Sequence, residues 1–170
     1  MMNQTYWLQA ETDIELSELL DMFWGFHDFK IEKVNYTSSK DQIDLLLEYD
    51  THEFSVLLRF AGKVSMNFQP VQDYDVDWLT GSSIGRNKQG QIVWAGADDI
   101  DGNDLPDDII WIAGDSIRYA YIDKNGEPKQ LPEDMINQVW HTLNYETGKY
   151  EDIKKGFHPR CCDINDDISS

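Results

Sequence analysis

The chain has 170 residues, a length typical of one domain that can bury a substantial core without disulfides or a metal. Its 32 acidic and 14 basic residues give a formal net charge of −18, which argues against nucleic acids and anionic membranes as partners because phosphate groups would repel the protein. Six Trp, eight Tyr and seven Phe exclude a disordered composition, and no apolar run approaches the roughly 20 residues of a membrane helix.

The start of the sequence and its two cysteines bear on where the protein is expected to reside. Residues 1–5 have neither the basic stretch nor the apolar segment of a secretory signal. Cys161 and Cys162 are adjacent, and neighbouring cysteines bridge only in a strained ring, so a reducing cytosol would keep them as free thiols. The sequence therefore predicts a cytoplasmic protein, with a regulatory bridge between the two cysteines as the alternative.

A first helix is expected over residues 13–24. Thr12 and Glu15 have the spacing of a capping box, in which each side chain accepts a hydrogen bond from the other residue's backbone N–H. Gly25 suits the position just beyond the helix, where a positive φ is common. The expected buried face repeats at helical spacing and consists of Leu16, Leu19, Leu20 and Phe23.

Residues 26–68 predict an antiparallel β-meander of four strands, at about 29–36, 43–49, 54–60 and 64–68. Apolar and polar residues alternate in each run, and turn residues separate the runs. The alternation changes phase between Ile31 and Val34, which indicates a bulge near Lys33. Pro70 ends the fourth strand because proline has no N–H to donate to a ladder.

The second half predicts shorter elements. A strand is expected near residues 74–78, a hairpin over 83–94, an apolar run of either strand or helix at 109–112, and a strand at 117–121 followed by an Asn125-Gly126 turn. Pro132 suits the first turn of a second helix over about 132–144. Without a repeat or linker, we expect an α+β fold in a single domain, 1–170: a curled antiparallel sheet flanked by an N-terminal and a C-terminal helix, with a loose tail from about 147.

An acidic loop at residues 98–108 is the most conspicuous candidate site. Its six aspartates are Asp98, Asp99, Asp101, Asp104, Asp107 and Asp108. Asp99, Asp101 and Asn103 match the first three ligand positions of a calcium loop, but Asp104 stands where that loop needs Gly and Ile110 where it needs Glu. A solvated loop, a docking surface for basic side chains and a weak cation site are therefore all open.

The other polar residues give weaker indications of a functional site. Asp73, Asp75 and Asp77 would repel one another on one strand face, and they could add to an acidic docking surface. His27-Asp28 is more typical of a helix-to-strand turn than of a catalytic pair. No nucleophile elbow, phosphate loop, dinucleotide fingerprint or metalloprotease motif is present, and we assign no catalytic residue and no cofactor.

The run Phe26-His27-Asp28-x-x-Ile31, with Val34 and Tyr36 after it, resembles a loose group of small bacterial proteins. Some members are described as immunity proteins of polymorphic toxin systems. The likeness extends through the strand rhythm to about Phe68, roughly a quarter of the chain. It implies an antitoxin-like cytosolic protein and carries over no catalytic residues.

We therefore expect a non-enzymatic acidic binding protein, immunity-like or inhibitor-like. Its acidic residues would dock on a basic protein partner, such as the active cleft of a toxin nuclease, and block it with electrostatic steering. The alternatives are a divalent-cation-binding protein that uses the 98–108 loop, and a housekeeping domain whose acidity only confers solubility. Neither a nucleic acid nor a membrane is expected as a partner.

Overall fold

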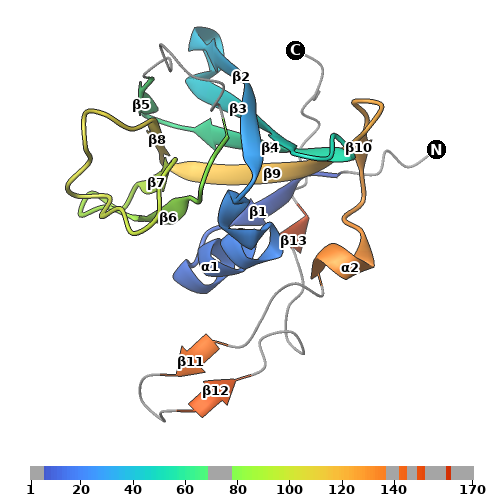
Figure 1. The fold of residues 1–170 in the computed structure, drawn as a ribbon. Helices are drawn as coiled ribbons and strands as arrows, with labels where there is room; N and C mark the ends of the chain where they lie inside the picture. The colour runs from blue at the N-terminus through green and yellow to red at the C-terminus, as the bar shows by residue number, and fades with distance from the viewer. Residues whose placement is uncertain (1–5, 69–77, 137–141, 145–148, 152–159, 162–170) are drawn as a thin grey trace.

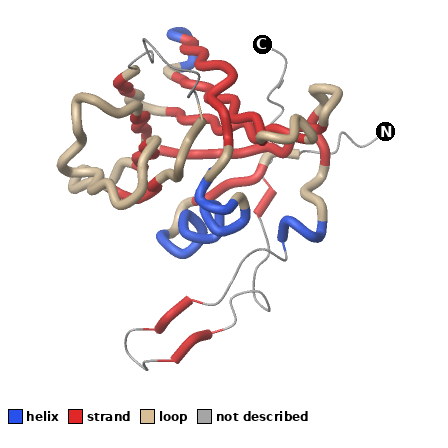
Figure 2. Tube along the Cα trace, viewed as in Figure 1, coloured by secondary structure: helices blue, strands red, loops and turns tan. Residues whose placement is uncertain are grey.

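The structure is a computed structural model, which describes residues 6–68, 78–136, 142–144, 149–151 and 160–161. Most of the described chain is antiparallel β-sheet, arranged as a large and a small sheet with one longer helix beneath them (Figures 1 and 2). The expectation of an antiparallel fold with few helices is confirmed. The single domain and its loose tail from about 147 stay a prediction.

Helix α1 (Asp13–Met22) begins as expected. The Thr12 hydroxyl accepts from the Glu15 N–H at 3.2 Å, and the Glu15 carboxylate accepts from the Thr12 N–H, which completes the capping box. The helix ends two residues earlier than expected, because the chain enters a left-handed turn, η1 (Trp24–Phe26). This turn puts Phe26 in the core, stacked on Phe23 at 5.6 Å between ring centroids, and reverses the chain toward the first long strand.

The large sheet has the order β13-β1-β9-β4-β3-β2, with β10 also paired to β9. Its strands are β1 (Leu8–Ala10), β2 (Phe29–Thr37), β3 (Gln42–Tyr49), β4 (Phe54–Ala61), β9 (Ser116–Asp123), β10 (Pro128–Lys129) and β13 (Arg160–Cys161). The first three strands of the expected meander are all present. The pairing of β2 with β3 shifts between Ile31 and Lys33, which confirms the predicted bulge.

The fourth strand of the expected meander leaves this sheet. Strand β5 (Ser65–Asn67) pairs with β8 (Trp111–Gly114) in the small sheet, and β9 takes the place beside β4. The chain turns away at Gly62, with φ of +83°, and at Lys63. Asp41 fixes the turn, because its carboxylate accepts from the backbone N–H groups of Lys63 and Val64. The predicted four-strand meander is therefore wrong in its last pairing.

The small sheet has the order β5-β8-β7-β6. Its remaining strands are β6 (Ser83–Arg86), β7 (Ile92–Ala95) and β8 (Trp111–Gly114). The expected hairpin at 83–94 is confirmed, and the ambiguous run at 109–112 leads into a strand. The strand expected near 74–78 falls on residues outside the described ones, apart from Trp78, which bridges to Lys30.

The expected C-terminal helix is confirmed only at its start, and its expected end is a strand. Helix α2 (Glu133–Ile136) is a single turn, closed by the N–H groups of Met135 and Ile136 on the Pro132 carbonyl. Residues 137–141 lie outside the described ones, and β11 (Thr142–Asn144) is a strand paired with β12 (Lys149–Glu151). Pairing with this later segment satisfies the backbone groups, and Thr and Asn are poor helix formers.

The core lies between the inner face of the large sheet, helix α1 and the small sheet. Buried side chains come from all three: for example Leu19 from α1, Leu45 and Leu58 from the large sheet, and Trp94 from the small one. The outer face of the large sheet carries a second, smaller cluster, formed by Trp7, Leu57, Ala120 and Ile122. Two faces of this fold can therefore present polar groups: the outer sheet face and the loops of the small sheet.

Candidate functional site

The acidic loop joins β7 to β8 at the end of the molecule where β9 begins (Figure 1). All six of its aspartates are exposed. Within the described residues none of the six forms an ion pair with a basic side chain. The loop therefore presents six carboxylates to solvent without internal neutralisation.

Several hydrogen bonds attach this loop to the β6–β7 hairpin. The Ser83 hydroxyl donates to the Ala97 carbonyl at 2.6 Å and accepts from the Ile100 N–H at 3.0 Å. The Asn103 side-chain oxygen accepts from the Lys88 N–H at 2.6 Å. At the start of the loop, the Asp98 carboxylate packs against Gly81, where a Cβ would have to displace it. These contacts therefore fix the conformation of the loop against the hairpin.

The residues that matched a calcium loop are used internally. An Asp101 carboxylate oxygen accepts from the backbone N–H of Asn103 at 2.9 Å and from its side-chain amide at 3.1 Å. The Asn103 oxygen is occupied by Lys88, and Asp99 sits in the left-handed region with φ of +56°. In the part of the chain that the structure describes, no three His, Cys, Asp or Glu side chains are grouped to hold a metal ion. The geometry favours outward presentation of charge over coordination.

Two other sequence candidates have different outcomes. Asp73, Asp75 and Asp77 lie outside the described residues. His27 and Asp28 lie in the turn before β2, with their side chains paired at 2.8 Å and both more than half exposed. The Asp28 N–H donates to the Leu79 carbonyl, so this residue ties the turn to the chain after Trp78.

Sequence reasoning missed a polar row across the outer face of the large sheet. Asp44 pairs in register with Arg59, and Arg59 with Arg118. Arg59 is only 4 % exposed and donates two hydrogen bonds to the Asp44 carboxylate, at 2.8 and 2.9 Å. Its guanidinium also lies 4.4 Å from the centre of the Trp7 ring. This bidentate, stacked arrangement is how a sheet face holds a buried arginine.

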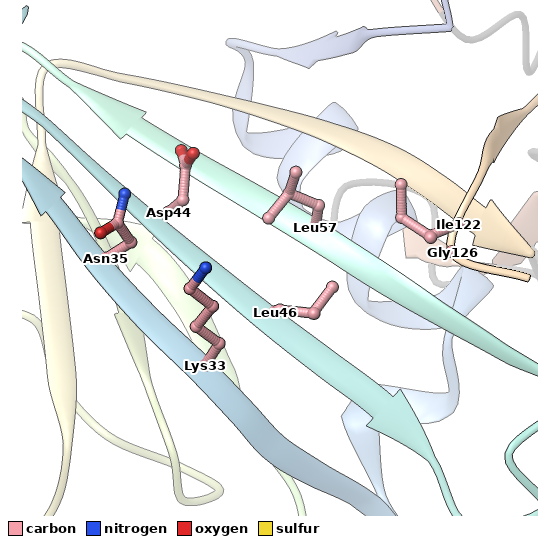
Figure 3. Close-up of a pocket in the computed structure, with 7 residues that line it drawn as sticks. All are labelled: Lys33, Asn35, Asp44, Leu46, Leu57, Ile122 and Gly126. Carbon is pink, nitrogen blue, oxygen red and sulfur yellow. The ribbon is translucent and has the colours of Figure 1, made fainter. Parts of the chain in front are cut away.

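A pocket of about 160 Å³ opens beside this row. Leu46, Leu57 and Ile122 form its apolar side, whereas Lys33, Asn35 and Asp44 form its polar side, and Gly126 borders it. Figure 3 shows these side chains rising from the same face of four neighbouring strands, with the polar ones gathered at one end. An arginine amid an apolar strand run, at residues 54–60, was the signal that this face is not plain solvent surface.

Helix α1 holds one buried acid. Glu18 is 6 % exposed, and no described donor reaches its carboxyl group. Burial, and then the nearby carboxylates of Glu15 and Asp21, raise the pKa of Glu18 to about 7. The burial of this carboxyl group therefore lowers the stability of the folded state at neutral pH, and Glu18 belongs to neither of the polar sites described above.

Comparisons with known proteins give no further guide. Among the described residues, none of the helices has the length and apolar character needed to cross a membrane. No family model matches the sequence, and comparison with curated proteins and with solved structures likewise gives no match.

Proposed function

We propose that this chain is a non-enzymatic acidic binding protein that docks its 98–108 loop on a basic protein partner, in the manner of an immunity protein. The observation that carries the proposal is the loop itself: six exposed carboxylates, none ion-paired among the described residues, on a segment bonded to a β-hairpin. A surface of this kind loses little conformational entropy on binding and attracts cations over a long range.

The proposed mechanism is steric blocking after electrostatic steering. The net charge of −18 accelerates encounter with a basic surface, and the loop fixes the register of the complex. Charge pairs at the rim of an interface mainly affect the association rate and its salt dependence. The proposal therefore predicts fast association that slows steeply as ionic strength rises.

The test measures binding to any toxin-domain protein whose gene neighbours that of this chain, by surface plasmon resonance at low and physiological salt. The loop variant removes four charges but keeps Asp98, which packs on Gly81, and Asp101, which bonds Asn103. Its four substitutions are Asp99→Asn, Asp104→Asn, Asp107→Asn and Asp108→Asn. We expect its association rate to fall about tenfold at low salt.

A charge-matched control separates the loop from the overall charge. It removes four exposed acids that lie outside the loop, two in the turn between β3 and β4 and two in α2: Asp50→Asn, Glu53→Gln, Glu133→Gln and Asp134→Asn. If both variants slow association equally, the loop is not the docking surface. The absence of salt-sensitive binding by the unmodified chain would overturn the proposal altogether.

A further inference from the structure

The outer face of the large sheet has a charge balance opposite to that of the whole chain. Side chains on this face alternate with the core residues of the same strands. At the paired positions of β2, β3, β4 and β9 on this face, four side chains are basic and two are acidic, in a chain with 14 basic and 32 acidic residues. They are Lys30, Lys33, Arg59 and Arg118, with Asp44 and Glu48. Glu32, in the bulge beside Lys33, has no partner in β3. The pocket beside Leu46 therefore lies in a locally basic region.

Among the described residues of this face, the ammonium group of Lys33 has no acidic partner. Asp44, the pocket's carboxylate, already accepts hydrogen bonds from the Nε and Nη2 groups of the buried Arg59. Lys33 stands opposite Leu46, an apolar residue, and has no ion pair within the described part of the chain. The bulge between Ile31 and Lys33 sets this register, because an inserted residue changes which side chains point outward.

The pocket thus combines three chemical features. Lys33 offers an ammonium group, Asn35 offers a side-chain amide, and Leu46, Leu57 and Ile122 offer an apolar floor. Figure 3 shows the two nitrogen-bearing side chains at one end of the pocket and Ile122 at the other. A ligand that matches this order has an anionic head and a short apolar body.

We propose that this pocket binds a small organic anion, a carboxylate that carries a short aliphatic chain or a single ring. The carboxylate would accept hydrogen bonds from the Lys33 ammonium and the Asn35 amide, and the apolar part would cover Leu46 and Leu57. An ammonium ligand is disfavoured, because Arg59 already neutralises the Asp44 carboxylate that would receive it.

The volume limits the ligand and its affinity. About 160 Å³ is below the range of roughly 300–1,000 Å³ that is usual for drug-sized ligands. A few apolar carbons and one charge-assisted contact correspond to binding near about 4 kcal/mol, or roughly millimolar dissociation constants. The acidic remainder of the protein is screened beyond about 8 Å at physiological salt, so it does not prevent an anion from entering.

The test follows backbone amide signals of the full chain by NMR during titration with three probes of equal length: hexanoate, hexanol and hexylamine. We expect saturable shifts at Lys33, Asn35, Leu46 and Gly126 with hexanoate. Hexanol lacks the charge, so we expect it to bind about tenfold more weakly. Equal binding of hexanol or hexylamine, or no saturable shift at these amides with hexanoate, would overturn the proposal.

Substitution of Lys33 identifies the group responsible. Lys33→Gln should weaken hexanoate binding about tenfold, whereas hexanol binding should stay unchanged. Lys40→Gln removes the same charge from the exposed turn after β2 and should leave both affinities unchanged. Lys33 is exposed, so its loss does not threaten folding. Unchanged hexanoate affinity in Lys33→Gln would overturn the assigned orientation and with it the proposal.

Discussion

Replacement of Glu18 by Gln should stabilise the protein at pH 8 and change it little at pH 5. Burial and the carboxylates of Glu15 and Asp21 raise the pKa of Glu18 from 4.5 to about 7. The folded state therefore keeps a proton that the unfolded state releases between these values. Since the folded state binds more protons there, the free energy of unfolding falls as pH rises through this window, and the full penalty is present above about pH 7.

The size of the effect follows from the same two values. A raised pKa costs about 1.4 kcal/mol per unit, so the penalty difference between pH 5 and pH 8 is roughly 2–3 kcal/mol. Glutamine has nearly the same shape, but its amide is also buried at this position, which costs about 1 kcal/mol at any pH. The penalty is about 1 kcal/mol at pH 5 and about 3 kcal/mol at pH 8, so after the amide cost we expect Glu18→Gln to gain about 2 kcal/mol at pH 8 and almost nothing at pH 5.

Urea denaturation followed by tryptophan fluorescence measures this directly. Other titrating groups are common to both proteins, so they cancel when the free energies of unfolding are subtracted at each pH. Glu32→Gln is the matched control, because it removes the same charge from an exposed position on β2. Parallel pH profiles of Glu18→Gln and the unmodified protein would refute the reasoning.

Three further perturbations test the described contacts. Asp44→Ala removes the carboxylate that pairs with the buried Arg59, and it should lower the free energy of unfolding, measured with urea, by about 3 kcal/mol. Replacing both residues by Leu should lower it clearly less. Equal losses would contradict a buried ion pair. Thr12→Ala removes the cap of α1 and should cost about 1 kcal/mol, and Thr12→Ser should restore most of it. Millimolar calcium or magnesium should leave the melting temperature unchanged, because the Asp101 and Asn103 oxygens already serve the loop; a rise of several degrees would favour the cation alternative.

The local parts of the fold could be predicted from the sequence, because their causes are local. Thr12 and Glu15 are three residues apart, and this spacing by itself predicts the capping box. The bulge at Lys33 likewise follows from a phase change within one strand. The partner of β5 could not be predicted, since it depends on a turn at Gly62 that Asp41 holds from about twenty residues earlier. Helical spacing near residues 136–143 also misled, because strand pairing with a later segment outweighs local propensity.

The candidate sites show the same contrast between local features, which the sequence predicts, and features that depend on residues far apart in the chain. The acidic loop could be counted directly from the sequence, although its attachment to Ser83 and Lys88 could not. The pocket was invisible, because Lys33, Asp44 and Ile122 become neighbours only through the register of four strands. A net charge of −18 also obscures this face, since a sum over the chain cannot reveal where its few basic residues gather.

The two proposed surfaces act independently at physiological salt. The polar end of the pocket, at Asn35, lies in register with Arg118 of β9 through β3 and β4, which is three strand spacings or about 14 Å across the sheet. The acidic loop lies past the Ser116 end (Figure 1), and the screening length is about 8 Å at physiological ionic strength. Neutralising the loop should therefore leave hexanoate binding unchanged there and strengthen it only at low salt, where screening extends to about 30 Å. If the loop variant altered hexanoate binding at physiological salt, the two surfaces would be one coupled site, and neither proposal could be tested without the other.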